Sequence, residues 1–177
     1  MKLTDLRPLF ARRVECGLAF TFGEFRADPA LAALDWPDYV IEQFLYEHGG
    51  SHQPFEEDYG SIDLERIVWQ IEMIRREDFC DMPTGASEAG LIEHIAERPA
   101  HYVGIRPERV GYHWEERGTW MLPPLLIDRC LMALTDGGLQ VLEGRTRVGV
   151  LRGRLREGMR VAPCHQAWVG RPRDVCA

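Results

Sequence analysis

The chain has 177 residues and a formal net charge of -7, with 45% hydrophobic and 28% charged residues. This length suits one domain with an appended subdomain, and the composition is ordinary for a globular protein. No window approaches the ~20 apolar residues that a membrane span requires, so a transmembrane protein is excluded. The N-terminal residues lack the apolar core of a signal peptide, and we therefore expect a cytoplasmic protein.

The charges are distributed unevenly along the chain. Residues 1–142 carry 13 Lys and Arg against 25 Asp and Glu, whereas residues 143–177 carry 8 against 3. Nearly all cations are arginines, whose planar guanidinium suits bidentate contact with carboxylate or phosphate. The basic C-terminal part could dock on the acidic part of the same chain or bind an anion. The acidic body makes duplex DNA an unfavourable partner, because DNA binding needs an extended basic surface.

The first hundred residues are predicted to be mainly helical. A helix is expected within residues 35–50, where Pro37 suits a first helical turn. Residues 61–78 show the strongest helical pattern, because apolar residues recur along one face. A further short helix is predicted over residues 87–98. We therefore predict an N-terminal helical subdomain.

Strand and turn signals dominate the rest of the chain. Residues 102–120 combine aromatic and β-branched residues with turn signals at residues 106–107 and 117–118, and the part GYHWEERGTW, residues 111–120, is expected to be a strand. Residues 123–134 form an apolar run that suits a buried strand or a short buried helix. A turn at residues 135–138 then leads to the strand LQVL, a Glu-Gly turn, a helix, and a closing strand within residues 159–169.

These elements together predict an α+β fold. The helical region, residues 1–100, is expected to pack on a small mixed β-sheet unit, residues 101–177.

The end of the strand LQVL brings together Glu143, Gly144, Arg145, Thr146 and Arg147. Backbone N–H groups at a helix N-terminus lack partners within the helix and favour a phosphate or carboxylate. Gly144 allows close backbone approach, Arg147 can add a bidentate contact, and Thr146 and Arg145 can assist. Glu143 could orient an arginine, hold a divalent metal or accept a proton. The turn is therefore the first candidate site.

The Glu-Gly-x-x-Arg pattern between a strand and a helix resembles the signature of the ParB/sulfiredoxin superfamily. The likeness covers about residues 105–170 and includes the preceding segments PPLLID and DGGLQVLEG and the small-residue helix RVGVLRG. It implies a ParB-like α/β unit that binds a nucleotide, ATP or CTP, with Mg²⁺ as a metal held by Glu143. It also implies phosphoryl transfer or phosphoester hydrolysis with Glu143 and Arg147 as catalytic residues.

The chain departs from the superfamily pattern at Arg145. Sulfiredoxins carry their reactive cysteine at this place, and partitioning ParB proteins usually carry a glutamate that they use with CTP. Sulfinic-acid reduction and a chromosome-partition clamp are therefore not expected.

Further along the predicted helix, Gly149 and Gly153 lie four residues apart and would let the helix backbone approach a sheet or a ligand closely. Packing against a sheet is the expected case. Arg152 and Arg156, also four apart, are expected to line a solvated face or to pair with acidic residues.

A second candidate pair lies in the predicted strand over residues 111–120. His113 and Glu115 would point to the same side of a strand and could bind a metal or transfer protons. A surface strand anchored by its aromatic residues explains the same sequence without any chemistry.

Two other function classes fit the sequence. A non-catalytic interaction protein of the regulatory or immunity type would use its acidic half to bind a basic protein partner. A nuclease-like, nucleic-acid-processing protein would need an exposed basic C-terminal face and salt-dependent binding. An anionic small molecule or nucleotide at residues 143–147 is the partner that we expect first.

Overall fold

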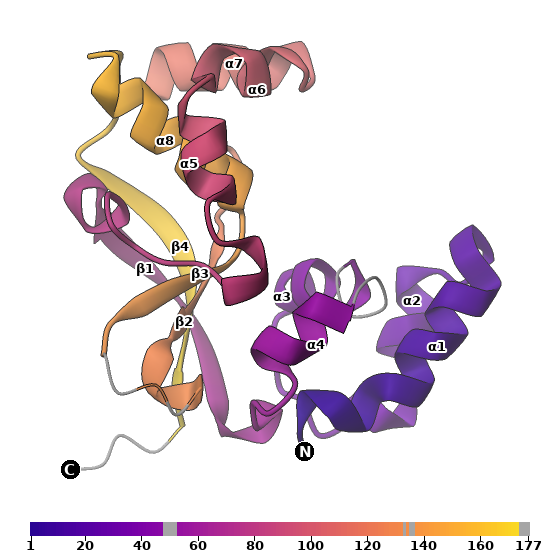
Figure 1. Cartoon of the computed structure of the whole chain (residues 1–177). Helices are drawn as coiled ribbons and strands as arrows, with labels where there is room; N and C mark the ends of the chain where they lie inside the picture. Colours follow the sequence, from indigo (N-terminus) through magenta and orange to yellow (C-terminus); the bar gives the residue numbers. More distant parts are fainter. Residues whose placement is uncertain (48–52, 133, 135–136, 174–177) are drawn as a thin grey trace. The chain divides into compact units, whose positions relative to one another are not determined.

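The computed structural model describes residues 1–47, 53–132, 134 and 137–173 (Figure 1). It combines helices with one mixed sheet, so the predicted α+β class is confirmed. The α-helices are α1 (Arg7–Cys16), α2 (Phe22–Arg26), α3 (Asp38–Val40), α4 (Gln53–Tyr59), α5 (Leu91–Ala96), α6 (Pro99–Gly104), α7 (Glu108–Arg117) and α8 (Arg145–Arg156). No helix among these described residues has the length and apolar character needed to cross a membrane.

The sheet has four strands in the order β1-β4-β2-β3, so β1 and β3 form its edges. The strands are β1 (Ile67–Arg75), β2 (Leu125–Asp128), β3 (Leu139–Glu143) and β4 (Cys164–Pro172). The predicted strand LQVL and the helix after the Glu-Gly turn are thus present as β3 and α8. The turn predicted before β3 falls partly on Thr135 and Asp136, which lie outside the described residues.

Contacts between residues divide the chain into two compact units. Unit 1 contains Met1–Gln70, Ile127–Gly138 and Gly170–Ala177, and unit 2 contains Ile71–Leu126 and Leu139–Val169. The predicted domain boundary between residues 100 and 101 remains a prediction.

Unit 1 has an aromatic core. The ring of Trp36 stacks on Phe44 with centroids 6.1 Å apart and meets the edge of Trp69 at 5.5 Å. Phe44 lies in a π-helix, Ile41–Tyr46, which continues α3 within the predicted helical segment. Aromatic side chains therefore share this core with the fully buried aliphatic residues Val40, Ile41 and Leu45 of the same segment.

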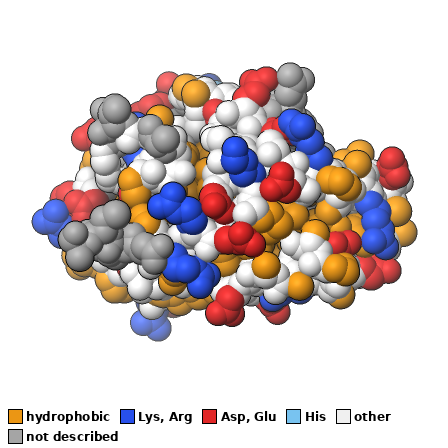
Figure 2. Space-filling view, turned by 90° about the horizontal axis from the view of Figure 1, so that it is seen from below, with side chains coloured by type: hydrophobic (Ala, Val, Ile, Leu, Met, Phe, Trp, Pro, Cys, Tyr) orange, Lys and Arg blue, Asp and Glu red, His pale blue; other side chains and the backbone are white. Residues whose placement is uncertain are grey.

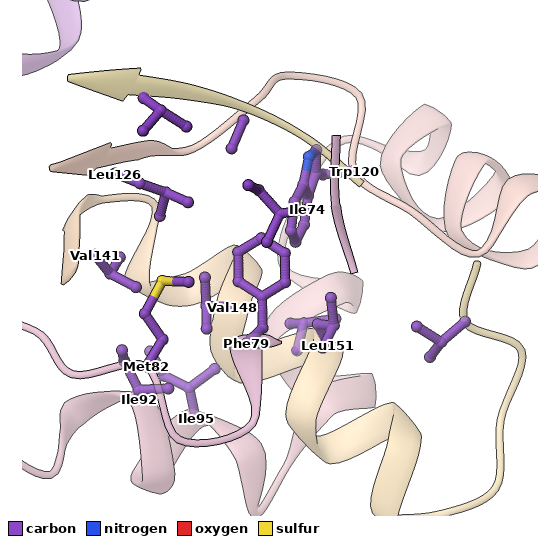
Figure 3. Close-up of a cluster of buried hydrophobic side chains, with 14 of the residues drawn as sticks. Ile74, Phe79, Met82, Ile92, Ile95, Trp120, Leu126, Val141, Val148 and Leu151 are labelled. Atoms are coloured by element: carbon purple, nitrogen blue, oxygen red, sulfur yellow. The ribbon is translucent and has the colours of Figure 1, made fainter. Parts of the chain in front are cut away.

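The core of unit 2 lies between α5, α8 and the sheet (Figure 3). Val148 and Leu151 on α8 are fully buried and contact a cluster that includes Ile92 and Ile95 on α5 and Leu126 on β2. Helix α8 is thus buried along most of its length, from Val148 to Arg154.

The helix predicted over residues 61–78 is wrong, because β1 occupies the middle half of this range. In the first half of β1, buried Ile67 and Trp69 alternate with exposed Val68 and Gln70. The spacing of apolar residues suited one helix face, yet several of them are β-branched and fit a pleated strand better. The two-residue alternation of a strand therefore describes this segment, and the helical spacing does not.

The strand predicted over residues 111–120 is also wrong, because these residues lie mainly in α7. The helix begins after Pro107 and ends at Gly118, which has a left-handed backbone with φ of 67°. The Tyr112 hydroxyl donates to Glu108 four residues earlier, at 3.0 Å, which only a helix brings together. Trp114 is the buried anchor of this helix.

Candidate functional site

The candidate turn lies between the end of β3 and the start of α8, as the sequence predicted. Gly144 is the N-cap residue of α8 and has a left-handed backbone with φ of 96°. A Cβ atom added there would lie 2.5 Å from the Cβ of Pro124. Glycine is therefore required both by its backbone angle and by close packing against the chain itself.

Arg145 is held by two acceptors. Its Nε lies 2.7 Å from the carboxylate of Glu88, and its side chain donates to the carbonyl of Leu142 at 2.6 Å. Glu88 belongs to a short 3-10 turn that precedes α5. The guanidinium is thus fixed beside the helix start, and its charge is offset by one carboxylate.

Arg147 is held in a similar way. It donates to the carbonyl of Pro123 at 3.0 Å and forms a 3.0 Å ion pair with Glu143. The structure therefore brings Glu143 and Arg147 together, as expected if the glutamate orients an arginine. Among the described residues, no group of three or more His, Cys, Asp and Glu side chains is arranged to hold a metal ion.

The first turn of α8 has an unusual electrostatic composition. It contains no acidic residue, and Gly144 supplies no side-chain cap. The first bond along the helix runs from the Val148 amide to the Gly144 carbonyl, at 3.0 Å. The amides of residues 145–147 precede this bond and have no acceptor within the helix. The half-buried Thr146 lies between the two arginines.

His113 and Glu115 do not form the predicted pair. They lie two residues apart on α7, so they point to different sides of the helix. The Glu115 carboxylate instead accepts a hydrogen bond from Arg154 at 2.8 Å, which lowers the pKa of Glu115 below its usual value. Within the described part of the chain, neither residue has a hydrogen bond or ion pair with the turn at 143–147.

The arginines further along α8 form a second group, and one of them contradicts the expected solvated face. Arg152 is only 7% exposed and donates to the carbonyls of Phe79 and Met82 at 2.8 and 2.6 Å. It also pairs with Glu93, which the more exposed Arg156 contacts as well. The expected pairing with acidic residues is thus confirmed, but Arg152 pairs with Glu93 from a buried position.

Arg154 is buried more deeply, at 2% exposure. Besides Glu115, it donates to the carbonyl of Arg160 at 3.2 Å and lies over the ring of Trp114, 5.5 Å from its centroid. A cation over an indole face is attracted by the ring electrons, which partly compensates for its desolvation. The sequence did not indicate this residue as buried.

The two glycines of α8 are explained by helix packing. A Cβ added at Gly149 would lie 2.6 Å from Ile95, and one at Gly153 would lie 2.5 Å from the carbonyl of Ala96. The expected close approach is therefore real, but its partners are α5 and the start of α6 rather than the sheet. Both glycines serve packing and not ligand binding.

One buried polar residue has no sequence signal. His165 on β4 is 1% exposed, its Nδ1 lies 2.7 Å from the Thr119 hydroxyl, and its ring lies 4.7 Å from that of Trp120. Burial disfavours the charged imidazolium and lowers the pKa of His165 to about 4. The ring is therefore neutral at neutral pH and is part of the core.

Charged side chains of both signs are interspersed with hydrophobic ones on the face shown in Figure 2. That face has no continuous basic area of the kind that duplex DNA requires.

Comparisons with models of protein families, with curated proteins and with solved structures find no significant match to this chain.

Proposed function

We propose that the turn formed by residues 143–147 binds an anionic small molecule, with the phosphate of a nucleotide such as ATP or CTP as its preferred group. The observation that carries this proposal is the start of α8, which has a left-handed glycine at the N-cap, no side-chain cap and no acidic residue in its first turn. Partial positive charge on unpaired amides at such a helix end favours an anion.

The two arginine–carboxylate pairs support the proposal by holding the guanidinium groups in place. Arg145 is fixed by Glu88 and Arg147 by Glu143, so a ligand would not have to order these side chains on binding. Each guanidinium has five N–H donors, and the observed contacts use only part of each set. Because two carboxylates offset the two cations, most of the attraction would come from the backbone amides and the helix dipole.

Binding is better supported than catalysis. Glu143 pairs with Arg147, and a role in holding Mg²⁺ or accepting a proton would require this contact to rearrange. Phosphoryl transfer and phosphoester hydrolysis therefore remain predictions. The relation of residues 105–170 to the ParB/sulfiredoxin superfamily is part of the same proposal, and the order of β3, Gly144 and α8 supports it.

Titration calorimetry with ATP, CTP and inorganic phosphate, each with and without Mg²⁺, tests the proposal. The informative variant is Thr146→Glu, because a carboxylate in the first turn stabilises a helix while it repels an anion. We expect this variant to fold normally and to lose at least about tenfold in affinity. Arg156→Gln, at the other end of α8, is the matched control and should bind like the wild type.

Two results would overturn the proposal. One is the absence of binding by the wild-type protein to any of the three probes. The other is equal binding by the wild type and Thr146→Glu.

A further inference from the structure

Residues 118–124, which we call the α7–β2 connection, join the end of α7 to the start of β2 and contain no helix or strand. Both ends of the connection are bonded to β4 or to the residues that precede it. The Ala162 amide donates to the Gly118 carbonyl at 2.9 Å. The Trp168 amide donates to the Pro124 carbonyl at 3.0 Å. The position of the connection therefore depends on these contacts with another part of the chain.

The buried His165 of β4 holds the middle of the connection. Its Nδ1 lies 2.7 Å from the Thr119 hydroxyl, and its ring lies 4.7 Å from that of Trp120. The Trp120 indole donates to the Gln166 carbonyl at 2.8 Å, and its ring meets that of Phe79 edge-on at 5.2 Å (Figure 3). One imidazole and one indole thus hold the connection against the core.

The same connection supports the candidate turn at residues 143–147. The Pro123 carbonyl accepts a hydrogen bond from Arg147 at 3.0 Å. Pro124 packs so closely on Gly144 that a Cβ atom added there would lie 2.5 Å from the proline Cβ. A displacement of the connection would therefore remove an acceptor of Arg147 and change the packing around Gly144. A continuous chain of contacts thus links His165 to the turn.

The surroundings of His165 oppose a charge on its ring. Among the described residues, Arg76 and Glu77 are the charged groups that act on it, and they pair with each other at 2.8 Å. Arg76 disfavours protonation, whereas Glu77 and the backbone of Ala162 favour it. Burial outweighs these influences and lowers the pKa of His165 to about 4. A protonated ring is therefore better accommodated where water can reach it.

We propose that protonation of His165 releases the α7–β2 connection from β4 and thereby loosens the turn at residues 143–147. The inference rests on the proposed function, because it describes how acid would regulate the anion site. Segments with few buried contacts open at a lower free-energy cost than the core. Met121 and Leu122 in the connection are 43 and 56% exposed, so its release exposes chiefly Trp120.

The direction of the pH effect follows from the two pKa values of His165. The ring has its ordinary pKa of about 6.5 when water surrounds it, and about 4 in the closed structure. The released state therefore binds the proton more readily and gains population as the pH falls. Between pH 7 and 4.5, the ratio of released to closed molecules should rise roughly 60-fold.

Amide hydrogen exchange, measured by NMR at pH 7 and 4.5 and corrected for the intrinsic exchange rate, tests the proposal. The reporters of release are the Ala162 amide and the Trp120 indole, and the reporter of the turn is the Val148 amide, whose acceptor is Gly144. Protection of the first two should fall roughly 60-fold in acid, and that of Val148 should fall with them. Low urea should not change this exchange, because a local opening exposes little surface.

Two variants and one titration identify the group responsible. His165→Phe keeps an aromatic ring in the core but takes up no proton, so it should lose most of the pH effect. His101→Phe, at an exposed histidine of α6, is the matched control and should respond like the wild type. NMR titration of the His165 ring in the wild type requires no variant, and the ring should become charged only near pH 4.

Four results would overturn the inference. The first is a His165 ring that titrates near pH 6.5 while the Ala162 and Trp120 reporters stay protected. The second is an equal pH effect in the wild type and His165→Phe. The third is exchange of the reporters through global unfolding alone, which urea would accelerate. The fourth is a Val148 amide that stays protected while the other two reporters lose protection.

Sulfate binding tests the proposed function separately, because sulfate stays a dianion over this pH range. A wild type that binds no sulfate at pH 7 would count against the anion site. The exchange of the Val148 amide needs no ligand, so it still decides whether His165 controls the turn.

Discussion

Arg152 and Arg154 lie in the second half of α8, where both are buried and donate to backbone carbonyls and carboxylates of other segments. Arg145 and Arg147 lie in the first turn, beside amides that have no acceptor within the helix. The two groups have the same chemistry and similar spacing in the sequence. Their surroundings separate their roles, because the second half of α8 is covered by neighbouring helices, while its first turn begins at Gly144, which supplies no side-chain cap.

The largest effect is expected from removing a buried arginine of the second half. Arg152→Met leaves the carbonyls of Phe79 and Met82 without their donor, and we expect the free energy of unfolding to fall by about 3 kcal/mol. Urea denaturation measures this change. Arg156→Met removes an exposed partner of the same Glu93 and should cost less than about 1 kcal/mol. An equal loss of unfolding free energy in the two variants would contradict the different roles of buried and exposed arginines.

A pH dependence tests the same core, because the carbonyl of Phe79 accepts from Arg152 and its ring lies 5.9 Å from that of His165. The folded-state pKa of His165, about 4, is below its unfolded value of about 6.5. The unfolded state therefore binds the proton more readily, and stability falls as the pH drops from 6.5 towards 4. The expected loss at pH 4.5 is about 2.5 kcal/mol relative to pH 7.5.

His165→Phe is the control for this titration. It removes the ionisable ring, so the difference in unfolding free energy between pH 7.5 and 4.5 should shrink by the amount given above. An unchanged difference would mean that carboxylates alone cause the acid sensitivity.

A smaller loss is expected from the glycine that brings α8 close to its neighbours. Gly153→Ala places a methyl group against the Ala96 carbonyl and Pro99, and we expect a loss of about 2 kcal/mol in spite of alanine's better helix propensity. Gly104→Ala is the matched control, because its Cβ would meet open space. Gly104→Ala should leave the free energy of unfolding unchanged or raise it slightly. Thermal unfolding of both variants gives the comparison, and a stabilising Gly153→Ala would contradict the close packing.

The end of β3, the turn and α8 could be predicted because their signals are local. Gly144 marks the break, and apolar residues such as Val148 and Leu151 recur at helical spacing after it. β1 was mispredicted because the spacing of its apolar residues suited one helix face, and α7 was mispredicted because its aromatic residues suited a strand. In such segments the choice depends on tertiary neighbours.

The environment of the arginines could not be predicted from the sequence. The partners of Arg152 are 59 to 73 residues away in the chain, and the spacing of charges contains no information on such contacts. Likewise, Glu88 is distant from Arg145 in sequence, and nothing near it indicates that it reaches the turn. The burial of His165 follows from β4 lying between β1 and β2, which is a property of sheet order.

The proposed difference between the first turn of α8, as an anion site, and its buried second half is tested most directly by a ¹H–¹⁵N NMR titration with inorganic phosphate. If the first turn is the anion site, the largest shifts will belong to the amides of residues 144–147, and they will be lost in Thr146→Glu. Shifts at Arg152, Arg154 and Arg156 should stay small, because their backbone amides are bonded within the helix. Largest shifts at those arginines, or none at the first turn, would contradict the account.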